Sequence, residues 1–327
     1  MKTSIGFLSI AHLHAYSYIH VLKQTEDAEV AGIWDHDFER GEKLADQYQV
    51  PFYRDREELV KKSDGVVVTS ENIYHLELVE VAARYGKPVL CEKPIAVNEE
   101  HGKKILSLAH ETGIPLMTAF PCRYSPAYQQ MKRYVLQGKL GRVLAVCATN
   151  RGMCPGGWFT KPELSGGGAM MDHVVHVADL LRDLLESEPI SVFAQIGNNL
   201  YRQEWEDTAI LHVRFANDVF ATLDSSWSRP QNYKIWGDVM MNVVGEEGVI
   251  EVDLFNQGFE MYRTDPNRYS LVSFGSSLDR NLIGDFLKVV RREKDPPITG
   301  FDGLQAARVA FAAYESVRRG APVEIVE

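Results

Sequence analysis

The first 120 residues alternate between short apolar runs and amphipathic segments, and this alternation restricts the possible fold more than any other feature. The apolar runs have the length and composition of strands buried on both faces; they lie at 3–10, 28–35, 64–70, 87–94 and 114–120. The segments between them have the apolar spacing of helices; they lie at 15–25, 37–50, 74–86 and 98–113. Repeated strand–helix–strand units predict a doubly wound parallel sheet with helices on both faces.

The pattern changes after residue 121. A helical segment at 125–138 is followed by longer runs that turn signals join, as expected for antiparallel strands. These runs lie at 141–152, 190–198, 207–217, 219–228 and 240–253. We therefore predict an α/β domain at 1–121 and an α+β domain at 122–327, the second with a largely antiparallel, open sheet.

Composition excludes several classes of function. A net charge of −10 over 327 residues argues against nucleic acid as a partner. No apolar run approaches the roughly 20 residues that span a bilayer, and the N-terminal run lacks a small-x-small cleavage site. The four cysteines form no C-x-x-C pair, which argues against structural zinc. We expect a cytoplasmic protein without a metal centre.

The turn after the first strand reads Ser9-x-Ala11-x-x-His14, with a further histidine at His12. A dinucleotide turn at this place reads G-x-G-x-x-G, because glycines let the backbone turn tightly and approach the pyrophosphate. Ser9 and Ala11 are small enough to keep the backbone accessible. The turn is therefore a cofactor site without glycines, a site that has lost its cofactor, or a strand–helix turn that binds nothing.

Asp35 ends the second apolar run, about 20 residues beyond this turn. A carboxylate there accepts hydrogen bonds from the adenosine ribose and repels a 2′-phosphate, which favours NAD over NADP. No arginine or lysine stands next to Asp35 to hold such a phosphate. The alternative interpretation is a surface aspartate in a turn.

Two further stretches suggest proton chemistry. Glu92 and Lys93 follow a buried strand at the sheet edge where open α/β sheets bind ligands, although a Glu–Lys surface pair is the simpler alternative. Asp172 and His176 are four residues apart on one helix, so a carboxylate can orient an imidazole for proton exchange. His173 lies beside them. A structural histidine and a helix-capping aspartate would explain the same pattern.

Taken together, these motifs resemble the glucose-fructose oxidoreductase / inositol dehydrogenase / rhizopine-catabolism family of NAD(P)-dependent oxidoreductases. The similarity runs through 66–97, 120–143, 166–181 and 300–325, in that order, and so covers essentially the whole chain. It implies a Rossmann domain followed by a domain that binds substrate and forms a homodimer or homotetramer through its sheet.

The resemblance also implies residue roles. Lys93 would touch nicotinamide and the reacting hydroxyl, His176 would be the acid/base, and Asp172 would bind substrate or orient His176. The bond before Pro94 would be cis. The residues implied to bind cofactor are Ser9, Ala11, His12, His14, Asp35, Ser70, Asn72, His75, Glu92 and Lys93. The residues implied to border the substrate are Arg123, Tyr124, Trp158 and His173.

The sequence departs from the family at the missing glycines and at Ser70-Glu71, where the family usually has Thr-Pro. Our first hypothesis is an NAD-dependent dehydrogenase that acts on a secondary hydroxyl of a sugar, a cyclic polyol or a related small molecule. The damaged turn motivates an alternative, a ligand-sensing or regulatory protein that keeps the fold without redox chemistry. A third possibility is an enzyme that holds and recycles its nicotinamide.

Overall fold

The computed structural model describes residues 2–264, 267–275 and 277–325, and the chain forms two compact units. The first unit comprises residues 1–121, 161–166 and 279–307, and the second comprises 122–160, 167–278 and 308–327. Within the described residues, no helix combines the length and the apolar character needed to cross a membrane.

The first unit contains a parallel five-stranded sheet with the strand order β2-β1-β3-β4-β5. The strands are β1 (Thr3–Leu8), β2 (Ala28–Trp34), β3 (Gly65–Val68), β4 (Val89–Glu92) and β5 (Leu116–Ala119). β3, β4 and β5 are buried along their whole length, as continuous apolar runs predict. The order reverses direction at β1, so the carboxyl ends of β1 and β3 flank a switch point where ligands bind in such sheets.

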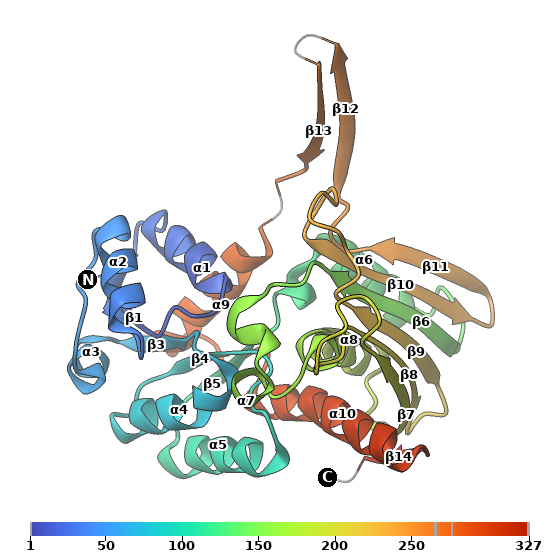
Figure 1. The fold of residues 1–327 in the computed structure, drawn as a ribbon, viewed down its shortest axis with the longest axis horizontal. Helices are drawn as coiled ribbons and strands as arrows, with labels where there is room; N and C mark the ends of the chain where they lie inside the picture. The colour runs from blue at the N-terminus through green and yellow to red at the C-terminus, as the bar shows by residue number, and fades with distance from the viewer. Residues whose placement is uncertain (1, 265–266, 276, 326–327) are drawn as a thin grey trace. The chain divides into compact units, whose positions relative to one another are not determined.

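Helices cover both faces of this sheet, with α1 and α9 on one side and α4 and α5 on the other (Figure 1). The helices are α1 (His14–Lys23), α2 (Phe38–Tyr48), α3 (Arg56–Lys62), α4 (His75–Arg84), α5 (Glu99–Thr112), α7 (Pro162–Ser165) and α9 (Leu278–Val290). Asp37, Asp55 and Asn98 cap α2, α3 and α5 by accepting from backbone N–H groups. The starts of these three helices are therefore encoded locally.

The second unit contains a seven-stranded sheet with the order β11-β10-β6-β9-β8-β7-β14. Its strands are β6 (Val143–Gly152), β7 (Pro189–Gly197), β8 (Thr208–Phe215), β9 (Phe220–Ser226), β10 (Gly237–Gly245), β11 (Gly248–Asp253) and β14 (Val323–Glu324). All neighbouring pairs are antiparallel except β6 and β9. Burial alternates along β8, so one face of the sheet is packed and the other is not.

The helix α8 (Ala169–Leu185) packs on the inner face of this sheet, against β6, β8 and β9. The carboxylate of Glu206 accepts from the N–H groups of Gly168 and Met170 at the start of α8, and Tyr314 donates to the same oxygen. Tyr314 lies on α10 (Gly300–Arg319), whose residues from 308 onward belong to this unit, and the unit also contains α6 (Pro126–Leu136). The start of α8 is thus fixed by side chains from two other segments.

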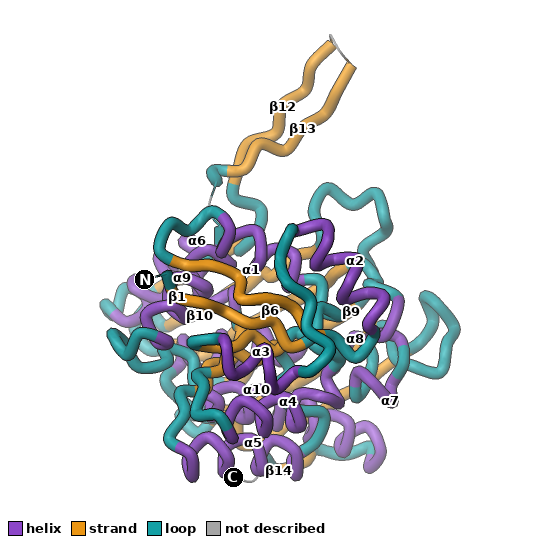
Figure 2. Tube along the Cα trace, turned by 90° about the vertical axis from the view of Figure 1, so that its left-hand side faces the viewer, coloured by secondary structure: helices purple, strands orange, loops and turns teal. Residues whose placement is uncertain are grey.

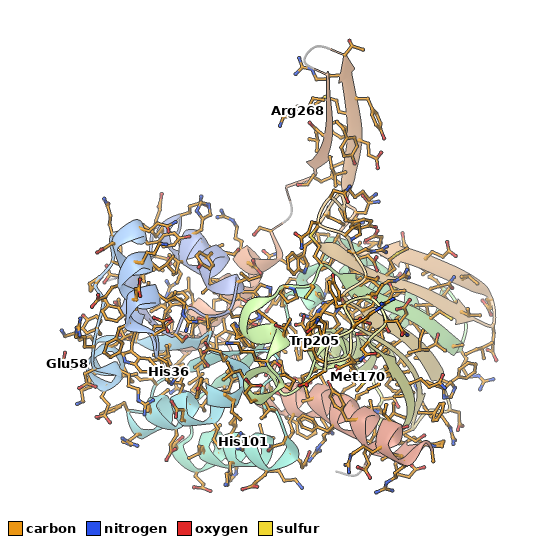
Figure 3. All side chains as sticks on the ribbon, viewed as in Figure 1. His36, Glu58, His101, Met170, Trp205 and Arg268 are labelled. Atoms are coloured by element: carbon orange, nitrogen blue, oxygen red, sulfur yellow. The ribbon has the colours of Figure 1, made fainter. Side chains whose placement is uncertain are left out.

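A two-stranded hairpin, β12 (Gly258–Thr264) and β13 (Asn267–Ser273), extends away from the seven-stranded sheet in both views (Figures 1 and 2). Arg268 lies out on this hairpin, far from Met170 and Trp205 of the same unit (Figure 3). Sequence analysis did not identify the hairpin, and it also missed α3, α7, α9 and β14.

Ser9 ends β1 with a φ of 68°, in the left-handed region that glycine prefers. It is fully buried, and its hydroxyl donates to Asp35 Oδ2 at 3.1 Å and accepts from the N–H of Ala11 at 3.3 Å. The chain therefore makes the tight turn of a glycine with a serine. The side-chain hydrogen bonds offset part of the strain.

Replacing Ser9 separates these two effects. Ser9→Ala removes the hydrogen bonds and keeps the strain, whereas Ser9→Gly removes both, so we expect the glycine variant to be more stable by about 1 kcal/mol. Urea unfolding of the two variants measures the difference. Ser107, on the exposed face of α5, is the control, because alanine should there be more stable than glycine. Equal stability of Ser9→Ala and Ser9→Gly would show that the turn carries no strain.

Candidate functional site

The backbone donors of the β1 turn are engaged by the protein itself. The N–H of Ile10 donates to Asp35 Oδ2 at 2.8 Å, and the N–H of His14 donates to His12 Nδ1 at 3.2 Å. The N–H of Ala11 donates to Ser9 Oγ, and that of His12 donates to the carbonyl of Thr69 at 2.9 Å. The fold thus makes the expected turn, but the N–H groups of residues 10–12 and 14 already have acceptors within the protein.

Asp35 is completely buried, and its carboxylate accepts hydrogen bonds from four residues. The donors are Ser9 Oγ, the N–H of Ile10, the N–H of Asp37 and the guanidinium of Arg40. Arg40 Nη2 lies 2.6 Å from Asp35 Oδ1, and Arg40 Nη1 lies 3.1 Å from Glu71 Oε1. The sequence argument that no basic residue accompanies Asp35 is therefore wrong. Arg40 lies in the first turn of α2, and its side chain folds back onto the carboxylate.

Three acceptor atoms gather on the segment that follows β3. Asn72 Nδ2 donates to the carbonyl of Ser165, and His75 Nδ1 lies 3.0 Å from the carbonyl of Pro94. Burial lowers the pKa of His75, so its ring is neutral and Nε2 is an acceptor. Among the residues that the structure describes, Asn72 Oδ1, His75 Nε2 and Glu71 Oε2 are buried without a hydrogen-bond donor. Ser70 is buried beside them and donates to the carbonyl of Glu71.

These atoms fit a dinucleotide, whose ribose hydroxyls and carboxamide supply donors. They lie after β3, beside the switch point of the sheet, where the fold class binds such ligands. Buried acceptors without donors are costly, and a ligand that brings donors would satisfy them.

Glu92, at the end of β4, is a buried carboxylate that side chains from α1 and the β1 turn surround. Tyr18 donates to Glu92 Oε1 at 2.7 Å, and His14 Nδ1 lies 3.1 Å from the same oxygen. His12 Nε2 lies 3.9 Å from Oε2. Burial alone would raise the pKa of Glu92, but His12, His14 and Lys93 together hold it well below its usual range. The carboxylate is therefore ionised at neutral pH.

His12, His14 and Glu92 are residue types that bind metals, and their ligand atoms lie within 4.8 Å of one another. However, His12 Nδ1 accepts from the N–H of His14, so in a neutral ring the proton sits on Nε2. That proton blocks the nitrogen that a metal would need. The geometry favours a hydrogen-bonded ionic cluster over a metal site.

Lys93 follows directly, with 4% of its surface exposed, and the peptide bond between Lys93 and Pro94 is cis, as the resemblance implied. The N–H of Lys93 donates to Glu92 Oε2. Glu92 and Lys93 thus share one turn, with Glu92 turned towards α1.

In the second unit, Asp172 lies in the first turn of α8 and is 9% exposed. Trp227 Nε1 donates to Asp172 Oδ2 at 3.1 Å, and His173 Nε2 lies 3.2 Å from the same oxygen. His173 Nδ1 in turn lies 3.0 Å from the carbonyl of Asn150. Trp205 packs edge-on against Trp227, with ring centroids 5.2 Å apart. The carboxylate is thus held by the indole of Trp227 and the imidazole of His173, and sequence analysis did not connect Trp227 to it.

His176 lies one turn further along α8 and is 8% exposed, with its Nδ1 3.9 Å from Cys122 Sγ. Arg123 makes a bidentate ion pair with Asp179, at 2.6 and 2.7 Å, and approaches Asp183. Its charge is therefore compensated inside the unit. Trp158 is 9% exposed and stacks on Phe159, and Tyr124 is half-buried.

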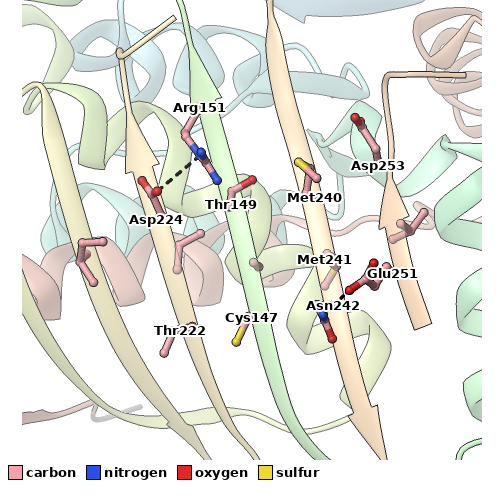
Figure 4. Close-up of a pocket in the computed structure, with 14 residues that line it drawn as sticks. Cys147, Thr149, Arg151, Thr222, Asp224, Met240, Met241, Asn242, Glu251 and Asp253 are labelled. Carbon is pink, nitrogen blue, oxygen red and sulfur yellow. Dashed lines mark hydrogen bonds and ion pairs between the residues drawn. The ribbon is translucent and has the colours of Figure 1, made fainter. Parts of the chain in front are cut away.

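The outer face of the seven-stranded sheet carries an open cavity of about 620 Å³ over β6, β8, β9, β10 and β11 (Figure 4). Arg151 pairs with Asp224 there, and Asn242 donates to Glu251. Ile210 and Met240 are 56% and 41% exposed on this face, and Phe220 is 46% exposed. The face thus mixes apolar side chains with polar pairs in which Arg151 Nε and Asn242 Oδ1 are buried without a hydrogen-bond partner.

Comparison with known proteins assigns the family. Residues 5–120 match the model of an oxidoreductase family with an NAD-binding Rossmann fold, and residues 128–251 match a GFO/IDH/MocA C-terminal domain. An inositol 2-dehydrogenase from Saccharopolyspora erythraea is 30% identical over 278 residues, which cover 80% of this chain and 77% of that protein. The chain belongs to the GFO/IDH/MocA family. The myo-inositol 2-dehydrogenase of Thermotoga maritima is 26% identical and covers 99% of the chain and 98% of its own length.

Solved structures agree. GenD2 from gentamicin A biosynthesis, in complex with NAD, superimposes with a TM-score of 0.90 at 22% identity, covering 100% of this chain and 97% of that one. A probable dehydrogenase from Thermotoga maritima gives 0.83 at 25% identity, covering 98% of both chains. The predicted family resemblance and fold class are confirmed, and the chain is an oxidoreductase with an NAD-binding Rossmann fold.

Proposed function

We propose that this protein is an NAD-dependent dehydrogenase that oxidises a secondary hydroxyl of a sugar or cyclic polyol, or catalyses the reverse reaction. The observation that carries the proposal is the presence of Lys93, Asp172 and His176 together in a chain of this family. The names of its relatives support the substrate class. They include inositol 2-dehydrogenases, a 1,5-anhydro-D-fructose reductase and a D-xylose 1-dehydrogenase.

Each residue has a distinct role in this proposal. When bound, the nicotinamide takes up or gives back the hydride. His176 takes the proton from the substrate hydroxyl as general base, and returns it in the reverse direction. The Lys93 ammonium donates to the reacting oxygen and stabilises the negative charge that develops there. Asp172 binds a neighbouring hydroxyl, and Trp227 and His173 hold its carboxylate in one orientation. Asn72, His75 and Glu71 hold the dinucleotide through their buried acceptors.

Removing the proposed acid/base groups tests this mechanism. A calorimetric titration first establishes whether the protein binds NAD⁺, NADH or NADPH, and a panel of sugars and cyclic polyols then identifies the substrate. Lys93→Ala and His176→Ala should each lower kcat by about 10²- to 10⁴-fold, because each removes a group that acts in the transition state. Nicotinamide binding should persist in His176→Ala.

Lys103→Ala, on the exposed face of α5, and His110→Ala, in its last turn, are the matched controls and should retain full turnover. Undiminished kcat in Lys93→Ala would contradict the mechanism. Ligand-induced thermal shifts with no turnover across the panel would instead favour the sensor hypothesis.

The charges around Arg40 support NAD over NADP. Asp35 and Glu71 carry two negative charges and Arg40 one positive charge, so this group has a net charge of −1. Arg40 is already paired with both carboxylates, which leaves little net attraction for a 2′-phosphate. In this proposal the preference for NAD over NADP depends on the combined charge of Asp35, Glu71 and Arg40, and not on Asp35 alone.

Neutralising Glu71 should shift this balance. In Glu71→Gln, the net charge becomes zero and one ion pair of Arg40 is lost, so the affinity for NADPH relative to NADH should rise by roughly three- to tenfold. Calorimetric titration with both cofactors gives the ratio. Glu77→Gln is the control, because Glu77 pairs with His36 and Arg56 and has no contact with Arg40 in the described structure. An unchanged ratio in Glu71→Gln would exclude Arg40 as a determinant of cofactor choice.

We also propose that the outer sheet face pairs two copies of the chain, since exposed apolar side chains on an open sheet are an aggregation hazard when they are uncovered. Ile210→Lys should convert the oligomer to a monomer, as measured by light scattering at micromolar concentration. The control is Leu136→Lys, because Leu136 is 52% exposed, close to the 56% of Ile210, and lies on the helix α6 rather than on the sheet face. This variant should not change the mass. A monomeric wild-type protein would contradict the proposal.

A further inference from the structure

The β1 turn differs from a glycine-rich turn in how it can meet a phosphate. In a glycine-rich turn, backbone N–H groups point at the phosphate oxygens. Here the N–H groups of residues 10–12 and 14 donate to protein acceptors. Within residues 10–14, the part of the chain that the structure describes gives no acceptor for the N–H of Leu13 alone. A diphosphate at this turn therefore needs donors from side chains besides this single backbone donor.

His14 is the side chain placed to supply one. It occupies the third position of the fingerprint, at the first residue of α1, and its side chain is 31% exposed. Its Nδ1 faces the buried Glu92 at 3.1 Å, which fixes the ring with Nδ1–H as a donor to that carboxylate. Its other nitrogen, Nε2, has no hydrogen-bond partner in the part of the chain that the structure describes.

The protonation state of His14 decides what Nε2 offers. In the neutral ring Nδ1 keeps the proton for Glu92, so Nε2 presents a lone pair, which repels a phosphate oxygen. In the imidazolium both nitrogens carry a proton, and Nε2–H is a charge-assisted donor. The same ring thus switches from an unfavourable to a favourable contact when it takes up one proton.

The groups that face His14 favour the charged ring. Glu92 on β4 and Asp279 on α9 attract the proton, and Lys93 opposes it. Tyr18 OH lies 3.3 Å from Nδ1, and the His12 ring centroid lies 4.5 Å from that of His14. Burial would lower the pKa of His14, but Glu92 and Asp279 raise it above its usual value.

We propose that His14, held by Glu92, serves as donor to the cofactor diphosphate in place of the backbone N–H groups that the protein itself engages, and that cofactor binding is therefore coupled to the uptake of a proton. This inference rests on the proposed nicotinamide dinucleotide site. The bound diphosphate adds negative charge beside the imidazolium and stabilises it further. Affinity is highest where His14 is already protonated, and it falls as the pH rises through the pKa of His14 in the free protein, by at most tenfold per pH unit.

The experiment measures binding without chemistry. Calorimetric titrations with NADH, ADP-ribose and adenosine from pH 6 to pH 9, in two buffers of different ionisation enthalpy, give both the affinity and the number of protons taken up. We expect NADH and ADP-ribose to bind more weakly as the pH rises, with proton uptake. Adenosine, which has no phosphate, should show neither effect.

Two variants locate the effect. His14→Gln should weaken ADP-ribose binding by about 10- to 100-fold at pH 6.5 and abolish its pH dependence, because a neutral amide cannot become a charged donor. His20→Gln, on the exposed side of the same helix, is the matched control and should behave as the wild type does. Near-ultraviolet circular dichroism checks that each variant is folded. If His14→Gln fails to fold, the comparison of ADP-ribose with adenosine in the wild-type protein still tests whether the pH dependence requires the diphosphate.

The outcomes separate this inference from the proposed function. Two results together would overturn the role of His14 and leave the dehydrogenase proposal intact. They are an affinity for NADH that does not change with pH, and an affinity for ADP-ribose that is the same in the wild type and in His14→Gln. No binding of NADH or ADP-ribose at any pH would overturn both. A pH-dependent affinity for adenosine would place the titrating group elsewhere in the site and refute the role of His14.

Discussion

The buried, ionised carboxylate of Glu92 is the interaction on which the rest of the candidate cofactor site depends. An isolated carboxylate in this position would cost several kcal/mol, so it must be paired or hydrogen-bonded. Tyr18 and His14 provide those bonds from α1, which ties the start of that helix to the end of β4. His14, which replaces the third glycine of the turn, and the neighbouring His12 are therefore part of a charge-compensated cluster. That cluster borders Lys93, the residue whose side chain we assign to the reacting oxygen.

A second buried carboxylate organises the other half of the turn. Asp35 was expected to bind a ribose, and that role remains a prediction. In the structure its oxygens accept from Ser9, Ile10, Asp37 and Arg40. These bonds hold Ser9 in a backbone conformation that serine adopts only at a cost, and such strain persists only where surrounding contacts maintain it. The turn keeps the shape of its glycine-rich counterpart through side-chain contacts.

The sequence predicted those features of the structure that depend on residues close together in the chain. The five strands of the first unit were recognisable because a strand covered on both faces must be apolar throughout, as in Val66–Val68. Lys93, Asp172 and His176 were selected as site residues because short motifs contain them, and their roles remain predictions. The hairpin β12–β13 was missed because its side chains are mostly exposed, so no burial pattern marks it. The segment 279–307 was assigned to the second domain, whereas it packs within the first unit. A local sequence pattern does not show which domain a later segment of the chain packs against.

The partners of the site residues were beyond the sequence for the same reason. Arg40 contacts Asp35 by folding back from the first turn of α2, and His14 contacts Glu92, which lies 78 residues away in the sequence. Trp227 meets Asp172 across 55. Each contact fixes the orientation of a side chain and pairs or compensates its charge. The contact therefore decides which atoms of the residue can still bind a ligand. Read as letters, Ser9, Ala11 and His14 are lost glycines. Read with Glu92 and Asp35, they describe a turn whose shape is held by side-chain hydrogen bonds. If His14 is the donor to the phosphate, as we propose, recognition of the cofactor depends on a proton.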